Sequence, residues 1–193
     1  MRHLFVAALA AALVAAASFV GSPSTVVRAQ ATDLLPTQAE LNSALAPLKV
    51  SSYMAGPGKD GWDANAEFDI DGSPDGMMHA LVDASELPTK EGAAGFLQTK
   101  LQQLRDGTRQ GGFIGDVGPA GDTLTQDADE AYFGVYQSPP GAPPMLVALQ
   151  ISRYEDQVIA TTVMLRGNGP ISEGAAQNLG FITGQLLKLM NED

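Results

Sequence analysis

The sequence contains no cysteine, which excludes disulfide bonds, a lipid-modified N-terminal cysteine and a cysteine nucleophile. Histidine is scarce, and His79 is the only one outside the first few residues. Most nucleophilic triads need a histidine, and the chain also lacks the G-x-S-x-G turn of many serine hydrolases. We therefore predict that the protein is not an enzyme and assign no catalytic residue.

Positive charge is also scarce. The chain has 11 Lys and Arg against 22 Asp and Glu, a net charge of −11. Such a surface repels phosphate backbones, so we expect no nucleic-acid partner. Any partner that is attracted by charge should be cationic.

The chain has a single long apolar run, over residues 4–20, directly after Met1-Arg2-His3. The small-x-small sequence Ala29-Gln30-Ala31 follows it, in the order of a secretory signal peptide. We predict a signal peptide over 1–31, cleavage after Ala31, and a secreted or extracytoplasmic protein. The alternative is an uncleaved membrane anchor, since 17 residues is at the short end of what spans a bilayer.

The remaining residues 32–193 suit one globular domain whose stability comes from its core alone. Removing residues 1–31 removes two arginines and no acid, so the net charge becomes −13. Thr37-x-x-Glu40 is a capping box that predicts a short helix. A long helix should begin after Thr89 and end at Gly107, and a second should follow Ser172 and run to about residue 190.

Five segments have strand character: 65–70, 77–84, 131–137, 145–154 and 157–166. The first two should form a hairpin, and Glu155-Asp156 should join the last two as antiparallel neighbours. Residues 51–64 and 111–128 are rich in glycine and predict loops, and Trp62 should cover the edge of the core. We predict an α+β fold: a curved antiparallel sheet of about five strands packed against two long helices, with a short N-terminal helix.

Two motifs could bind metal. Met77 and His79 share a strand face, which suits copper, but no second histidine is near. Residues 69–76 are rich in Asp and Gly like a calcium loop, yet Pro74 and Ala80 stand where an EF-hand needs Gly and Glu. The composition is typical of a hairpin turn. We predict no metal site and no cofactor.

Two further features carry alternatives. Asp127, Asp129 and Glu130 gather carboxylates of the kind that glycoside hydrolases use, although the chain has few aromatics to line a sugar cleft and a solvated loop explains them better. Ala176, Gly180 and Gly184 form a stripe of small residues four apart on the last helix. The stripe indicates either close packing on the sheet or a face for self-association.

The succession of elements resembles a known family. Leu34-Leu35-Pro36-Thr37, the run Ala128-Asp129-Glu130-Ala131-Tyr132, and Met164-Leu165-Arg166-Gly167-Asn168 before a terminal helix are similar to small exported bacterial domains of the PsbP-like kind. These include LpqN-type lipoproteins and extracytoplasmic sensor domains of receptor kinases. The resemblance implies an α/β/α sandwich with a binding cleft and no catalytic residues, but this chain lacks the cysteines of those relatives.

Our first hypothesis is therefore a secreted, non-catalytic binding or sensor-like domain. Its cleft should lie between the sheet and the loops 51–64 and 111–128, and its partner should be a small molecule, a lipid or a protein. The alternatives are a structural or interaction protein of the cell envelope and a carboxylate-dependent hydrolase. We expect a monomer that meets a membrane only if residues 1–31 are retained.

The signal-peptide hypothesis predicts the mature N-terminus. Mass spectrometry of the protein recovered from the culture medium of an exporting bacterial host should find chains that begin at Thr32. Recovery of the uncleaved chain from the membrane fraction alone would favour the anchor instead.

Overall fold

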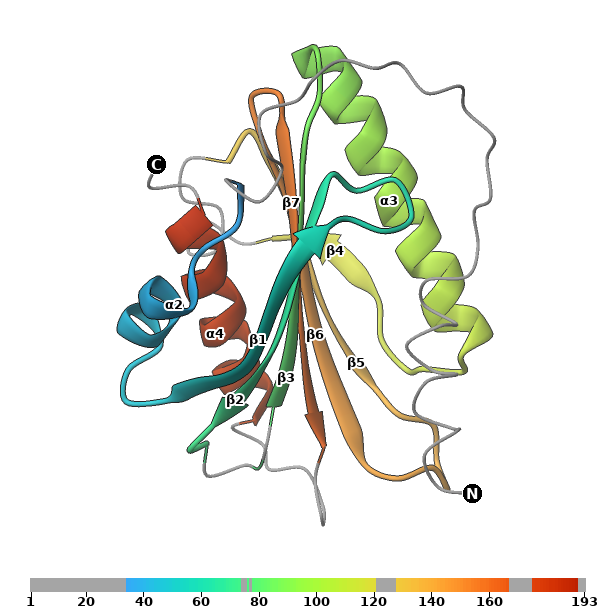
Figure 1. Ribbon diagram of the computed structural model, residues 1–193. Coiled ribbons are helices and arrows are strands. Elements are labelled where there is room, and N and C mark those ends of the chain that lie inside the picture. The colour runs from blue at the N-terminus through green and yellow to red at the C-terminus, as the bar shows by residue number, and fades with distance from the viewer. Residues whose placement is uncertain (1–33, 74–75, 77, 121–127, 167–174, 191–193) are drawn as a thin grey trace.

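The computed structural model describes residues 34–73, 76, 78–120, 128–166 and 175–190. Its strands form one antiparallel sheet of seven. Their order across the sheet is β1-β2-β3-β7-β6-β5-β4 (Figure 1). The strands are β1 (Lys49–Pro57), β2 (Ala64–Asp71), β3 (Met78–Glu86), β4 (Val117–Pro119), β5 (Glu130–Gln137), β6 (Met145–Tyr154) and β7 (Gln157–Arg166).

Two kinds of connection build this sheet. The predicted hairpin is confirmed, with Phe68 of β2 opposite Ala80 of β3, and so is the tight turn between β6 and β7. The pairing of β3 with β7 then joins segments that are far apart in sequence, from Met78 opposite Leu165 to Glu86 opposite Gln157. This pairing places the β1–β3 half of the sheet beside the β4–β7 half.

Helices lie on both faces of the sheet. The helices α2 (Gln38–Ala44) and α4 (Ala175–Met190) cover one face, and α3 (Lys90–Gln110) lies on the other (Figure 1). The predicted capping box at Thr37 is confirmed, and Thr89 caps α3 by accepting a hydrogen bond from the Gly92 backbone N–H. No helix of the described residues is long and apolar enough to cross a membrane.

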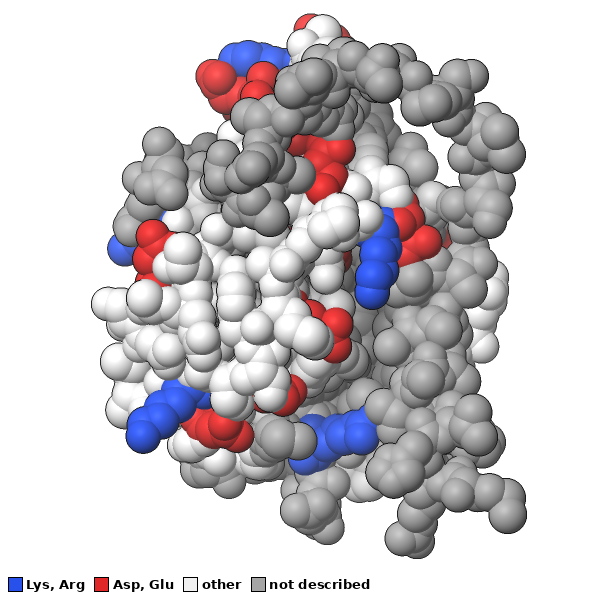
Figure 2. Space-filling model, in the orientation of Figure 1, with Lys and Arg blue, Asp and Glu red and all other residues white. Residues whose placement is uncertain are grey.

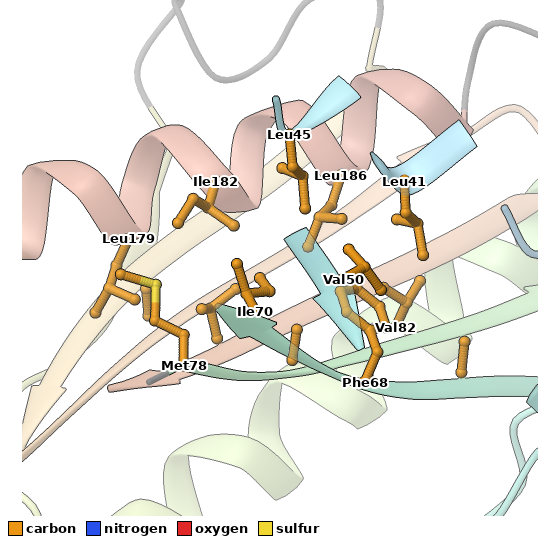
Figure 3. Packing of buried hydrophobic residues seen from close by; sticks show 14 of the residues in the cluster. Leu41, Leu45, Val50, Phe68, Ile70, Met78, Val82, Leu179, Ile182 and Leu186 are labelled. Carbon is orange, nitrogen blue, oxygen red and sulfur yellow. The ribbon is translucent and has the colours of Figure 1, made fainter. Parts of the chain in front are cut away.

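The core has a layer on each side of the sheet. On one side, Leu179, Ile182 and Leu186 of α4 pack on Phe68 and Met78 (Figure 3). On the other side, α3 packs on β6 and β7 through buried residues that include Leu97, Leu101, Leu149, Ile151 and Ala160. Burial of each large apolar side chain stabilises the fold by about 1.5–3 kcal/mol.

The predicted fold class was wrong. The sheet has seven strands rather than about five, and the described helices have 7, 21 and 16 residues. Residues 49–57 form β1, which escaped prediction because a bulge between Ser51 and Met54 breaks its alternation. The edge strand β4 is only three residues long, Val-Gly-Pro, inside a segment that reads as a loop.

The predicted end of α3 was also wrong. Gly107 is buried within the helix, which continues to Gln110. The left-handed conformation instead occurs at Gly112, with φ of 70°. The signal-peptide residues 1–31 and the predicted cap Ser172 lie outside the described residues.

The pairing of β4 with β5 depends on one glycine. A Cβ atom at Gly134 would lie 2.5 Å from Cγ2 of Val117, whereas one at Gly118 would meet nothing within 4 Å. We expect Gly134→Ala to lower the free energy of unfolding by about 1–3 kcal/mol and Gly118→Ala to change it by less than about 0.5 kcal/mol, as measured by urea denaturation. Equal effects of the two substitutions would contradict this packing.

Candidate functional site

The side of β2 and β3 that faces away from α4 is polar. Asp83 is opposite Ala160, which packs with α3, so alternate residues of β3 lie on the α3 side of the sheet. The helix α3 itself lies over β6 and β7. We call this side of β2 and β3 the polar face; its polar residues include Asn65, Glu67, Asp69, His79 and Asp83, and Leu81 lies among them.

His79 lies between two carboxylates on the polar face. Its Nδ1 atom is 2.9 Å from Oδ1 of Asp69, and its Nε2 atom is 3.1 Å from Oε1 of Glu67. All three side chains are about one-third exposed. Each ring nitrogen of His79 thus lies within hydrogen-bond distance of one carboxylate, so the ring orientation is held from both sides.

Asp83 lies at the other end of the polar face and is more deeply buried. The Asn65 side chain donates a hydrogen bond of 2.8 Å to it. Burial raises the pKa of Asp83 to about 6, while the Asn65 hydrogen bond and the nearby Lys100 charge partly oppose that rise. Asp83 therefore gains or loses its proton near the pH at which many proteins work.

Lys100 of α3 is buried beside Asp83. Its Nζ atom donates to the backbone carbonyl oxygen of Asp60 and lies 5.1 Å from the ring of Trp62 and 5.0 Å from that of Phe96. The two rings meet edge to face, with 5.1 Å between centroids. Burial lowers the pKa of Lys100, and the negative charges of Asp60 and Asp83 partly oppose this change. These contacts fasten the turn between β1 and β2 to α3.

The residues of the metal hypotheses have other partners. Met77 and residues 74–75 lie outside the described residues. His79 is surrounded by carboxylates, and Asp71 accepts a 2.6 Å hydrogen bond from Ser51. In the described part of the chain, no three His, Cys, Asp or Glu side chains are placed to hold a metal ion.

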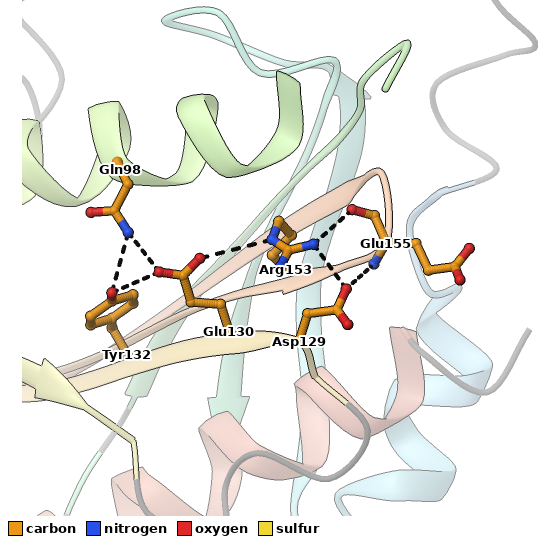
Figure 4. A network of polar contacts seen from close by, with 6 residues as sticks. All are labelled: Gln98, Asp129, Glu130, Tyr132, Arg153 and Glu155. Atoms are coloured by element: carbon orange, nitrogen blue, oxygen red, sulfur yellow. Dashed lines mark hydrogen bonds and ion pairs between the residues drawn. The ribbon is translucent and has the colours of Figure 1, made fainter. Parts of the chain in front are cut away.

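The carboxylates of the hydrolase hypothesis converge on Arg153 (Figure 4). Oδ2 of Asp129 is 2.9 Å from Nη1 of Arg153, and Oε2 of Glu130 is 3.9 Å from its Nε. Glu130 also accepts hydrogen bonds from Tyr132 and Gln98. Asp127 lies outside the described residues. The two described carboxylates thus share one guanidinium instead of facing each other across a pocket.

The small-residue stripe includes a contact with the sheet. A Cβ atom at Gly180 would lie 3.4 Å from Cζ of Phe133 on β5, which fits the packing interpretation. The side chain of Ala176 is outside the described part, and Gly184 is half-buried. Near this helix, an open groove of about 290 Å³ runs between α2 and α4, lined by Glu40, Ser43, Ala44, Gln185, Lys188 and Leu189.

The structure describes only part of the two segments that were predicted to line the cleft, 51–64 and 111–128. Residues 51–57 belong to β1, and residues 121–127 lie outside the described part. Sequence reasoning missed Asn65, Asp83 and Lys100 as site residues. The alternation of Asn65, Glu67 and Asp69 with apolar neighbours was a usable signal, because it places the three on one face of a strand.

Charge on the molecular surface agrees with an acidic protein. In the view of Figure 2, the Lys and Arg side chains lie apart from one another, so the described residues of this side present no basic patch. The three carboxylates of the polar face, from Glu67, Asp69 and Asp83, lie near three basic side chains: His79 contacts the first two, and Lys59 and Lys100 act on Asp83.

No family model matches the chain, and no curated protein matches its sequence. Among solved structures, it is similar to the extracellular domain of PknH from Mycobacterium tuberculosis, with a TM-score of 0.50 and 12% identity. The likeness covers 86% of this chain and 98% of the other. At this identity the likeness concerns the fold alone. The chain therefore has the fold of a domain that lies outside the cell.

The raised pKa of Asp83 predicts how stability depends on pH. The folded carboxyl holds its proton to about pH 6 and the unfolded one only to about pH 4, so this group makes the free energy of unfolding fall as pH rises between these values. Asp83→Asn should remove that fall and stabilise the protein at pH 7 by on the order of 2 kcal/mol.

Urea denaturation at pH 4.5 and pH 7 measures this difference. Glu86→Gln, at the exposed end of the same strand, is the matched control and should leave the dependence as in the wild type. If Asp83→Asn showed the same pH dependence of the free energy of unfolding as the wild type, the assignment of that dependence to Asp83 would be contradicted.

Proposed function

We propose that this protein is an extracytoplasmic domain that binds a cationic ligand on the polar face of β2 and β3 without transforming it. The observation that carries the proposal is the His79 cluster. It places Glu67 and Asp69 together on a half-buried strand surface. This surface is on the α3 side of the sheet, beside the strands β6 and β7 that α3 covers. We include in this proposal the resemblance of the chain to PsbP-like binding domains.

Three features support a ligand at this place. The carboxylates are fixed by paired strands, with Asp69 directly opposite His79, so their positions are preorganised. Their partial burial strengthens attraction to a cation relative to fully exposed charges. The net charge of −11 would speed the approach of a cationic partner.

The alternatives have less support. A carboxylate-dependent hydrolase needs two facing carboxyl groups, and Asp129 and Glu130 are instead engaged with Arg153. An envelope protein that self-associates through α4 would need the small-residue stripe to be free, and Gly180 packs against Phe133. The groove between α2 and α4 is the second candidate surface, and it lies away from the polar face.

Binding of a charged peptide tests the proposal. A fluorescently labelled peptide of alternating Lys and Gly should bind in fluorescence anisotropy, more weakly as salt is added, and its Glu-Gly counterpart should not. The double substitution Glu67→Gln with Asp69→Asn should weaken binding at least fivefold, because it removes both negative charges of the cluster.

The matched control is Glu91→Gln with Asp106→Asn, which removes the same charge from exposed positions of α3. It should leave affinity within about twofold. Equal weakening by the two double variants would mean that net charge alone attracts the peptide, and the site would be rejected.

A further inference from the structure

The turn that joins β1 to β2 has an anchored base and a separately held tip. At its base, the Asp63 backbone N–H donates to the carbonyl oxygen of Ala84 and to the hydroxyl of Ser85, and the Asp63 carboxylate accepts from the Glu86 backbone N–H. These bonds fix residue 63 to β3. The Gly58 backbone N–H donates to the carbonyl oxygen of Asp63, which closes the turn, and the rest of the tip, residues 58–62, is held by other contacts.

The tip is held by α3. Lys100 donates to the carbonyl oxygen of Asp60, and the Trp62 ring packs edge to face on Phe96. Both contacts come from one side of one helix, and Lys100 is only 6% exposed. The tip carries Asp60 and Gly61 in left-handed backbone conformations, and the Trp62 N–H donates to the carbonyl oxygen of Lys59, so the tip is a tight turn with its own hydrogen bond.

The closed tip also determines the surroundings of Asp83. The groups that act on Asp83 come from three elements: Asn65 from β2, Lys100 from α3, and Lys59 and Asp60 from the tip. Movement of the tip away from α3 would expose Asp83 to water and separate it from Lys59 and Asp60. Open and closed tips therefore differ in how strongly they favour the protonated carboxyl.

We propose that residues 58–62 form a latch that closes over the Asp83 end of the polar face, held by Lys100 and tightened when Asp83 takes up a proton. Its effect on ligand access depends on the proposed function. The latch itself does not, because its contacts involve no ligand.

The direction of the pH effect follows from linkage. Burial in the closed state raises the pKa of Asp83 to about 6, whereas a solvated carboxyl has a pKa of about 4. Proton binding therefore favours the closed latch, and the ratio of open to closed forms should increase as pH rises from about 4 to above 6. The difference in pKa sets an upper limit of about a hundredfold on that change.

Trp62, the only tryptophan in the chain, reports the state of the latch directly. Acrylamide quenching of its fluorescence in the folded protein should increase at least twofold between pH 4.5 and pH 7.5. Asp83→Asn should abolish this dependence and keep quenching low. Lys100→Met, which retains a chain of similar length without the ammonium, should raise quenching at both pH values.

Asp106→Asn, which removes a carboxyl group from an exposed position of α3, serves as the control and should keep the wild-type response. Circular dichroism at both pH values ensures that the chain is folded. Quenching that does not change with pH in the wild type, or that changes equally in Asp83→Asn, would overturn the latch. Since no ligand is present, this result is independent of whether the polar face binds cations.

Discussion

The pairing of β3 with β7 is the constraint on which the rest of the structure depends. It joins an N-terminal meander, β1 to β3, to a C-terminal one, β4 to β7, through nine opposed residue pairs. The helix α3 connects the two and packs on the second. As a result, one side of the first meander lies beside α3 and carries the polar residues, while its other side forms the core with α2 and α4 (Figure 3).

This arrangement explains why polar groups gather where they do. Between β6, β7 and α3 the alternating side chains are apolar, and along β2 and β3 the same side carries Glu67, Asp69 and His79. Lys100 sits where these two regions meet, so its ammonium lies near Asp83 while its chain packs among aromatic rings. Both the proposed binding surface and the proposed latch thus lie where the strands covered by α3 meet the polar face of β2 and β3.

Local features of the fold could be predicted from the sequence, and long-range ones could not. The capping box at Thr37, the hairpin of β2 and β3 and the turn at Glu155 each depend on neighbouring residues. The strand β1 was missed because its bulge breaks the alternation that identifies a strand. The His79 cluster requires the register of β2 on β3, and the contact of Lys100 with Asp60 spans 40 residues, so neither is visible in a local pattern.

The central claim is that the polar face of β2 and β3 is the binding surface. Carbodiimide-driven labelling of carboxyl groups, read by mass spectrometry with and without the Lys-Gly peptide, locates the contact without any substitution. The account predicts that the peptide protects Glu67 and Asp69 while Glu91 and Asp106 are labelled as before. Protection of Glu40, in the groove between α2 and α4, with unchanged labelling of Glu67 and Asp69 would contradict it.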